Sequence, residues 1–374
     1  MKNEKGKNQS HAHGSARRTT QSRKMRRAFS WALVLAMLLS LLPANAAFAA
    51  PGDPPSAITA QPPLGVEWTV VSSAAELKTA IEGPALYVKL GADITVPASY
   101  RDFAAMNTSK AGAFILDGDG KKLVFIGGHY ASTGHIKVEN VSKMPSLTVR
   151  NIEVHASHAR GFIWGGYRGE VNFSEMKFIG PAVSDLTSTS KAVRQNIYNC
   201  DITLAIRLNN TTDEYVHVGN NAMLATQVAS TSSSGTGAST SGLSSVRTAP
   251  AFSSRFIEFF GDNTLVKPHT NSTGYQKIFY LGRDSSGAVF RVAEGATLDI
   301  EDQSHSRQGT YPNGLFNSAN NRSIVTVAER ATFNYRNTGD YGGVIVRGNT
   351  AAHFLASFTI EKDATVNFAL KTPG

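Results

Sequence analysis

The chain contains one cysteine among its 374 residues. A single thiol excludes an internal disulfide framework and a structural zinc site built on cysteines. This residue, Cys200, follows the strand-like residues Ile197 and Tyr198, and no cluster of basic residues beside it would activate the thiol. We therefore expect Cys200 to be a buried structural residue.

Charged residues are also scarce, at 17% of the chain, and the positive excess is confined to one end. Residues 1–49 contain nine Lys and Arg against one acid, so they carry +8 of the net charge of +9. The remaining chain is nearly neutral and has no electrostatic preference for polyanions, which excludes nucleic acid as the expected partner. With 41% hydrophobic residues, the chain can still bury a substantial core.

Long hydrophobic runs are absent except for one, from Ala28 to Leu42, which follows the basic stretch Arg23–Arg27. The run is shorter than the ~20 residues that a membrane-spanning helix needs. Small residues follow it, with Ala47 and Ala49 in the pattern of a secretory cleavage site. We predict a signal peptide over residues 1–49, with a cut after Ala46 as the alternative. The mature protein is then secreted, extracellular or cell-wall associated, and has no membrane span. The long polar lead-in is common in Gram-positive exported proteins.

Helical patterns are nearly absent after the leader. Residues 50–66 form a Pro-rich leader, and Ser73 with Glu76 then makes a capping box that predicts a short helix over residues 74–82. Every later segment alternates short β-rich runs with Gly, Asn, Asp or Ser turns. This pattern excludes ordinary βαβ architecture and leaves a sandwich, a barrel or a solenoid.

Internal repeats favour the solenoid. Residues 292–300, 327–335 and 360–368 align without gaps, at spacings of 35 and 33 residues. Further apolar runs precede each copy, so each period supplies three short strands, as in one turn of a parallel β-solenoid. An antiparallel sandwich of hairpins remains the alternative.

The alternation within each copy predicts which side chains face the core. The inward positions are Ala296, Leu298, Ile300, Ala331, Phe333, Tyr335, Ala364, Val366 and Phe368. The outward positions are Thr297, Thr332 and Thr365, with Asp299, Asn334 and Asn367 in the next column. We expect the two outward sets to stack in register as an outer ladder.

The domain is predicted to cover residues 67–374 and to be interrupted by a Ser/Gly/Thr-rich loop or linker at 226–251. The last repeat is followed directly by residues 371–374, without a capping element. Because solenoids need polar caps, we expect the native chain to continue beyond residue 374.

Three consecutive segments of the sequence resemble a known protein family. They are the capped helix of residues 70–81, the strand segment 86–96, and residues 114–125 with the turn Asp117-Gly-Asp119-Gly. This succession resembles the start of right-handed parallel β-helix proteins of the pectate lyase superfamily. It most resembles the non-catalytic, pectate-lyase-like adhesive domains of secreted Gram-positive proteins. The resemblance implies an all-β, right-handed parallel β-helix whose N-terminal helix caps the stack.

The sequence offers little chemistry for catalysis. The resemblance to pectate lyases would imply an acid cluster that holds calcium and an arginine that removes a proton. The sequence motifs that correspond to these two features are missing from this chain. Asp117 and Asp119 are explained by turn geometry. The weak catalytic candidates, near Glu153, are His155, His158, Arg160 and Arg168. A solvated turn explains the same residues.

Two aromatic residues, Trp164 and Tyr167, are weak candidates for stacking on a sugar, although such residues more often belong to the core. We expect no metal site, no cofactor and no enzymatic activity. The sequence therefore favours a cell-surface adhesin that binds carbohydrate, with an extracellular glycan or a host or neighbouring-cell surface as its partner. A polysaccharide lyase or hydrolase on the same scaffold, or a structural spacer of a larger surface protein, is the alternative.

Overall fold

The structure is a computed structural model. It describes residues 59–100, 103–126, 135–138, 143–156, 161–167, 169–186, 193–207, 214–219, 223–226, 252–254, 256–261, 264–267, 277–281, 288–302, 314–318, 322–338, 344–348 and 355–370. The chain divides into two compact units, Met1–Ala50 and Pro51–Gly374, and every described residue belongs to the second. The predicted signal peptide and nearly all of the Ser/Gly/Thr-rich segment at 226–251 lie outside the described residues.

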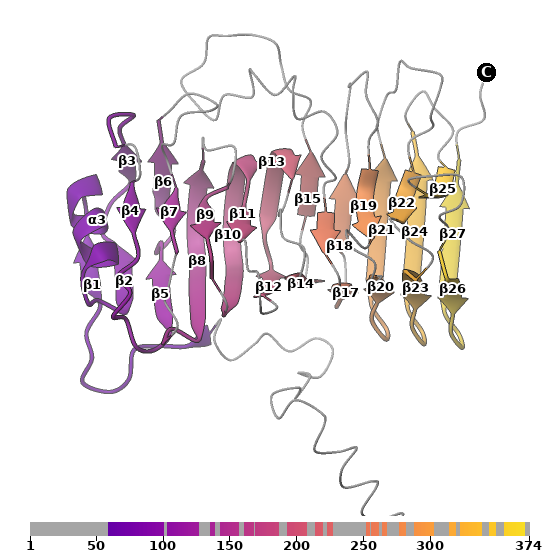
Figure 1. The fold of residues 1–374 in the computed structure, drawn as a ribbon, viewed down its shortest axis with the longest axis horizontal. Helices are drawn as coiled ribbons and strands as arrows, with labels where there is room; N and C mark the ends of the chain where they lie inside the picture. The colour runs from indigo at the N-terminus through magenta and orange to yellow at the C-terminus, as the bar shows by residue number, and fades with distance from the viewer. Residues whose placement is uncertain are drawn as a thin grey trace, which may run out of the picture. The chain divides into compact units, whose positions relative to one another are not determined.

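The fold is all-β, with three sheets and a helix, α3 (Ala74–Glu82), beside the first strand (Figure 1). The largest sheet comprises β1 (Thr69–Val71), β2 (Tyr87–Leu90), β3 (Ile94–Val96), β5 (Phe114–Asp117), β6 (Lys122–Phe125), β8 (Ser146–His155), β10 (Glu170–Ala182), β12 (Val193–Tyr198), β13 (Asp201–Arg207), β14 (Glu214–Gly219), β15 (Met223–Thr226), β17 (Phe256–Phe260), β18 (Thr264–Lys267), β20 (Val289–Val292), β21 (Thr297–Asp302), β23 (Ile324–Val327), β24 (Thr332–Asn337), β26 (Ser357–Ile360) and β27 (Thr365–Ala369).

Two smaller sheets complete the fold. One comprises β4 (Ala104–Ala105), β7 (Ile136–Lys137), β9 (Ile163–Gly165) and β11 (Ser184–Leu186), and the other comprises β16 (Phe252–Ser254), β19 (Lys277–Leu281), β22 (Gly314–Ser318) and β25 (Val344–Gly348). All the described pairings are parallel, so the antiparallel sandwich that the sequence left open is wrong. Each C-terminal repeat supplies three strands, such as β22, β23 and β24, as the spacing of the copies predicts.

The helix forms where the capping box predicts it. Ser73 Oγ accepts a hydrogen bond from the Glu76 amide at 3.2 Å, while Glu76 Oε2 accepts one from the Ser72 amide at 2.7 Å. These bonds satisfy backbone donors that the first helical turn leaves free. Leu77, Ala80 and Ile81 are buried against the strands.

The core is a stack of inward columns that run from strand to strand. In the C-terminal repeats it is largely aromatic, with Phe290 at 4.8 Å from Phe316 and 6.1 Å from Phe333 between ring centroids. The predicted inward residues Leu298, Phe333 and Tyr335 are all at most 1% exposed. In the last repeat, Phe368 is 38% exposed, because β27 has a described neighbour, β24, on one side.

The tight turns that join β20 to β21, β23 to β24 and β26 to β27 repeat one backbone conformation. The third residue of each turn has positive φ: Gly295 at 68°, Arg330 at 59° and Asp363 at 57°. Glycine adopts this conformation without steric cost, whereas the two later repeats hold a side chain in it. The turn conformation is therefore a property of the repeat rather than of glycine.

A buried ion pair ties the first strands to the preceding segment. Arg150 Nε on β8 donates to Asp117 Oδ2 on β5 at 2.8 Å, and Arg150 Nη1 donates to the Ala60 carbonyl at 2.8 Å. The Arg150 guanidinium also lies over the Trp68 ring, 5.7 Å from its centroid. The two charged side chains are 9% and 12% exposed, so this cluster is held largely away from water.

Candidate functional site

The second strands of successive repeats share one outward register column, here called the outer column. Its members, strand by strand, are Lys122, Glu153, Lys177, Asp201, Met223, Leu265, Asp299, Asn334 and Asn367. The residues beside it in the strands, such as Leu123, Val154 and Phe178, are buried. Because strand side chains alternate between faces, the polar members of the column point away from the core. The outer column continues from one side of the Ser/Gly/Thr-rich segment to the other. β15, which precedes that segment in the sequence, pairs with β18, which follows it.

The C-terminal end of the outer column is an amide ladder. Asn334 Nδ2 donates to Asp299 Oδ1 at 2.7 Å, and Asn367 Nδ2 donates to Asn334 Oδ1 at 2.7 Å. Thr297, Thr332 and Thr365 lie in register two residues earlier, as the aligned copies predict. Each amide has a second N–H and a second carbonyl lone pair, which are available to hydroxyl groups of a ligand.

The N-terminal end of the outer column is charged. Glu153 Oε1 lies 3.3 Å from Lys122 Nζ and 2.7 Å from His155 Nε2, while its Oε2 lies 3.7 Å from Lys177 Nζ. The hydrogen bond with His155, supported by the two lysines, lowers the pKa of Glu153 even though partial burial opposes the shift. Glu153 is therefore an ionised carboxylate among cations and is poorly suited to act as a general acid.

The weak catalytic candidates are only partly within the described structure. His155 ends β8 and is partly exposed beside Glu153, whereas His158, Arg160 and Arg168 lie outside the described residues. The described ranges contain no group of three or more His, Cys, Asp or Glu side chains placed to hold a metal ion.

The two aromatic candidates have different surroundings. Tyr167 is 1% exposed and its hydroxyl donates to the Met144 carbonyl at 3.1 Å, so its ring belongs to the core and presents no face to a sugar. Burial also raises the pKa of Tyr167. Trp164 on β9 is partly exposed, lies edge-on to His135 with ring centroids 5.2 Å apart, and lies below Lys137 Nζ.

The remaining sequence candidates have structural roles. Asp117 Oδ1 accepts a bond from the Asp119 amide at 2.9 Å, and Asp119 has a φ of 50°, which is the turn geometry that the sequence predicts. Cys200 is buried, and burial raises the pKa of its thiol to about 12. The sequence did not indicate Arg150, because its pairing with Asp117, 33 residues earlier, depends on strand register.

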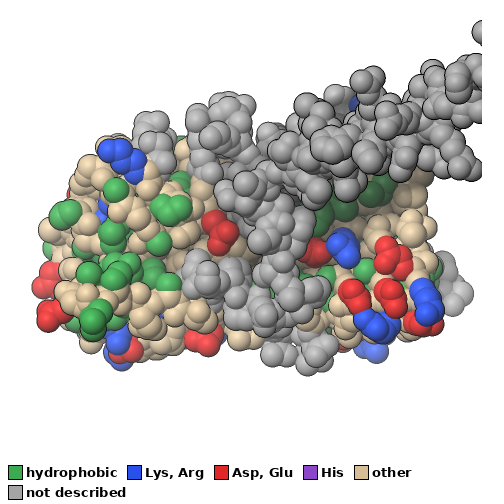
Figure 2. Space-filling view, turned by 90° about the horizontal axis from the view of Figure 1, so that it is seen from below, with side chains coloured by type: hydrophobic (Ala, Val, Ile, Leu, Met, Phe, Trp, Pro, Cys, Tyr) green, Lys and Arg blue, Asp and Glu red, His purple; other side chains and the backbone are tan. Residues whose placement is uncertain are grey.

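Two exposed ion pairs of the described residues lie at turns of the C-terminal repeats. Arg330 pairs with Glu294, and Lys362 Nζ lies 3.8 Å from Asp363 Oδ2. Figure 2, viewed from below, shows acidic and basic side chains gathered at one end of this face. Since both signs are interspersed and exposed, this cluster is weak as a binding site for a ligand of one charge.

No family model matches the chain, and no curated protein matches it. Two solved structures are similar. The chain described as "L. reuteri 53608 SRRP" is 13% identical, with a TM-score of 0.36, over 80% of this chain and 99% of its own length. The chain described as "L. reuters 100-23 SRRP" is 13% identical, with a TM-score of 0.40, over 81% of this chain and 99% of its own.

Proposed function

We propose that the chain is an exported, non-catalytic binding module, built as a right-handed parallel β-helix, that attaches to an extracellular glycan through its outer column. The parallel pairing of strands in one repeat with their counterparts in the next, such as β23 with β26 and β24 with β27, supports a β-helix. Parallel strands joined by crossovers are right-handed in about 98% of cases, which supports the hand. In the described residues no helix is long and apolar enough to cross a membrane.

One observation carries the binding proposal: the amide ladder of Asp299, Asn334 and Asn367 faces outward in register. Parallel strands place its members about 4.8 Å apart. Such a row offers regularly spaced donors and acceptors to the repeated hydroxyl groups of a sugar chain. Because two of its three members are neutral, it suits hydroxyl groups better than a polyanion.

The charged end of the outer column argues against the alternative of a polysaccharide lyase. β-Elimination needs a base near the proton that is removed and a cation that stabilises the developing charge. Around Glu153, Lys122 and Lys177 pair with a carboxylate of the protein itself, and His155 Nε2 is hydrogen-bonded to it. The described cations at that end of the column are therefore shared with a protein carboxylate, and the described residues there include no acid cluster that could hold calcium.

We expect no unsaturated product when the purified protein is incubated with pectate, alginate or hyaluronan, with or without calcium. The measurement is ultraviolet absorbance of unsaturated uronide, with a known lyase as positive control. A calcium-dependent absorbance rise that disappears in Arg160→Ala/Arg168→Ala would instead assign the protein to the lyases and overturn the non-catalytic proposal.

The binding proposal is tested on a glycan array followed by titration of the best glycan. Asn334→Ala/Asn367→Ala is expected to weaken binding about ten-fold or more, because two hydrogen-bonding amides of ~1 kcal/mol each are removed. The control is Thr326→Ala/Thr359→Ala, which changes an outward register pair on the first strands of the same repeats. The control is expected to bind within about two-fold of the wild type.

The same titration distinguishes the spacer alternative. A spacer shows no saturable binding to any glycan on the array, and that result would contradict the proposal. Equal losses in the two double variants would also contradict it, since they would mean that binding does not depend on the amide ladder. Thermal unfolding of both variants is measured in parallel, so that a loss of binding is not confused with a loss of folding.

A further inference from the structure

A groove lies beside the first strand, far in the sequence from the amide ladder. Its volume is about 890 Å³, and its walls are β1, α3, the start of β2 and residues 63–67. Val66 and Val70, which line it, are 47% and 60% exposed. Both valines line the same groove, and exposed apolar residues that form one contiguous patch, unlike single ones, mark interaction sites.

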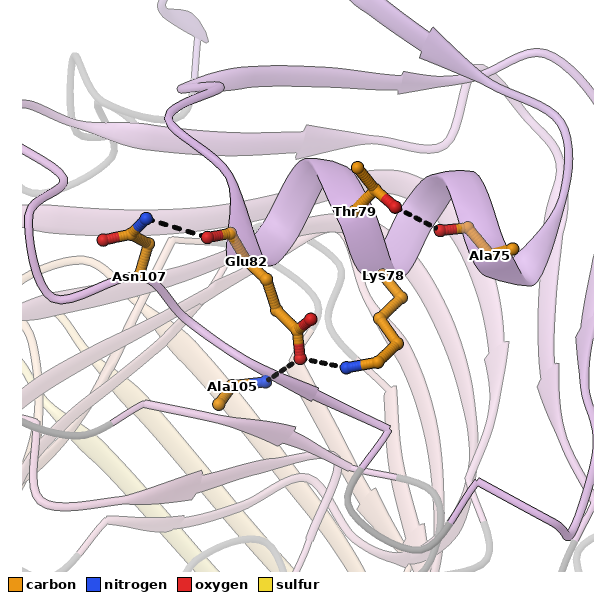
Figure 3. A network of polar contacts seen from close by, with 6 residues as sticks. All are labelled: Ala75, Lys78, Thr79, Glu82, Ala105 and Asn107. Atoms are coloured by element: carbon orange, nitrogen blue, oxygen red, sulfur yellow. Dashed lines mark hydrogen bonds and ion pairs between the residues drawn. The ribbon is translucent and has the colours of Figure 1, made fainter.

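Polar contacts hold the C-terminal end of α3 in place. The Glu82 carboxylate binds Lys78 and accepts a bond from the Ala105 amide on β4, and the Glu82 carbonyl accepts one from Asn107 Nδ2 at 2.8 Å (Figure 3). The C-terminal end of the helix is therefore fixed toward β4. The groove is lined by α3 from Ala75 on its first turn to Thr79 and Gly83 at its C-terminal end.

The main chain of β1 has hydrogen-bonding groups, an N–H and a C=O, on its edge away from β2. The Gly91 amide donates to the Val71 carbonyl at 2.8 Å, so Val71 faces β2, its partner in the described sheet. In a parallel strand, alternate residues direct their N–H and C=O to opposite edges. The N–H and C=O of Val70 therefore point to the edge away from β2. On that same edge the amide of Ser72 is bound by Glu76 Oε2.

The charge of the groove is acidic. Glu67 and Glu76 are the charged residues that line it. The nearby cations of α3 and β2 are paired elsewhere, Lys78 with Glu82 and Lys89 with Asp119. An apolar groove with two carboxylates and a strand edge is complementary to an extended peptide that combines apolar and basic side chains.

We infer that this groove binds an extended, basic and apolar segment of a partner protein, which adds to β1 as a further strand. Main-chain bonds with Val70 hold the segment, its apolar side chains contact Val66 and Val70, and a lysine or arginine lies opposite Glu67. This is recognition by strand addition, in which the edge supplies affinity and the pockets supply specificity. The inference is independent of the glycan site.

The test uses the purified full chain and a labelled synthetic peptide of alternating valine and threonine with lysine at each end. We expect saturable binding in fluorescence anisotropy with a Kd tighter than about 1 mM. Val70→Pro removes the edge N–H and no bond to β2, so it is expected to weaken binding at least ten-fold without lowering Tm. Val70→Thr keeps the N–H and is the matched control, with an expected loss of less than about three-fold.

A second variant keeps the inference falsifiable if Val70→Pro destabilises the fold. Glu67→Lys is expected to reverse the preference, so that a peptide with glutamate at each end binds more tightly than the lysine peptide. The inference is overturned if the wild type shows no saturable binding of the lysine peptide. It is equally overturned if Val70→Pro binds as the wild type does, or if Glu67→Lys retains the original preference.

Discussion

Replacing Phe333 by alanine is expected to lower the free energy of unfolding by about 3–5 kcal/mol. The ring is fully buried in the aromatic column of the C-terminal repeats. Its centroid lies 6.2 Å from that of Phe316 and 5.8 Å from that of Phe368, so truncation leaves a cavity between adjacent repeats. Rigid stacked sheets cannot collapse into such a cavity without disturbing the ladders on either side. Urea unfolding followed by tryptophan fluorescence measures the change.

The matched control is Thr332→Ala, one residue earlier on β24. Thr332 lies in the outward column with Thr297 and Thr365, so its replacement is expected to change stability by no more than about 0.5 kcal/mol. Comparable losses in the two variants would show that the assigned inward and outward faces of β24 are incorrect.

Replacing Arg150 by methionine is expected to lower the free energy of unfolding by a similar amount, about 3–5 kcal/mol. The guanidinium is bonded to Asp117 and to the Ala60 carbonyl, and the variant leaves the Asp117 carboxylate largely buried without its counter-charge. The contact with Trp68 is lost as well, which detaches the segment before β1 from β8. The difference in the free energy of unfolding between the wild type and Arg150→Met, from urea unfolding of each protein, measures this loss.

Two further variants separate the buried charge from other effects. Asp117→Asn/Arg150→Met is expected to recover part of the lost stability, because no uncompensated carboxylate remains. Arg330→Met removes an ion pair with Glu294 in which both side chains are about half exposed or more, and is expected to cost about 0–1 kcal/mol. If Arg330→Met cost as much as Arg150→Met, burial would not be the reason for the effect.

The outer column changes chemistry along its length, and this change locates the proposed glycan site. At the N-terminal end, Glu153 pairs with Lys122 and Lys177 and is hydrogen-bonded to His155. At the C-terminal end, Asn334 and Asn367 use one side of each amide for the ladder and keep the other side for a ligand. This difference is the reason why the proposed glycan site is placed at the C-terminal end of the column.

Local patterns in the sequence determined the elements and their faces. The capping box predicts α3, and the three aligned copies predict the register of Thr297, Thr332 and Thr365. These features follow from interactions between residues close in the chain, or from a period that repeats without gaps. Alternation along a strand needs only the pleat of the backbone.

Only the tertiary structure decided which residues of unlike repeats meet. Lys122, Glu153 and Lys177 occupy one column, and Asp117 contacts Arg150. The sequence segments that carry these residues show no alignment to one another. Their register depends on the lengths of the turns between the strands. The burial of Tyr167 likewise depends on the segment that carries the Met144 carbonyl. A sequence shows which face a residue takes on its own strand, but the neighbour that it meets is fixed by the path of the whole chain between them.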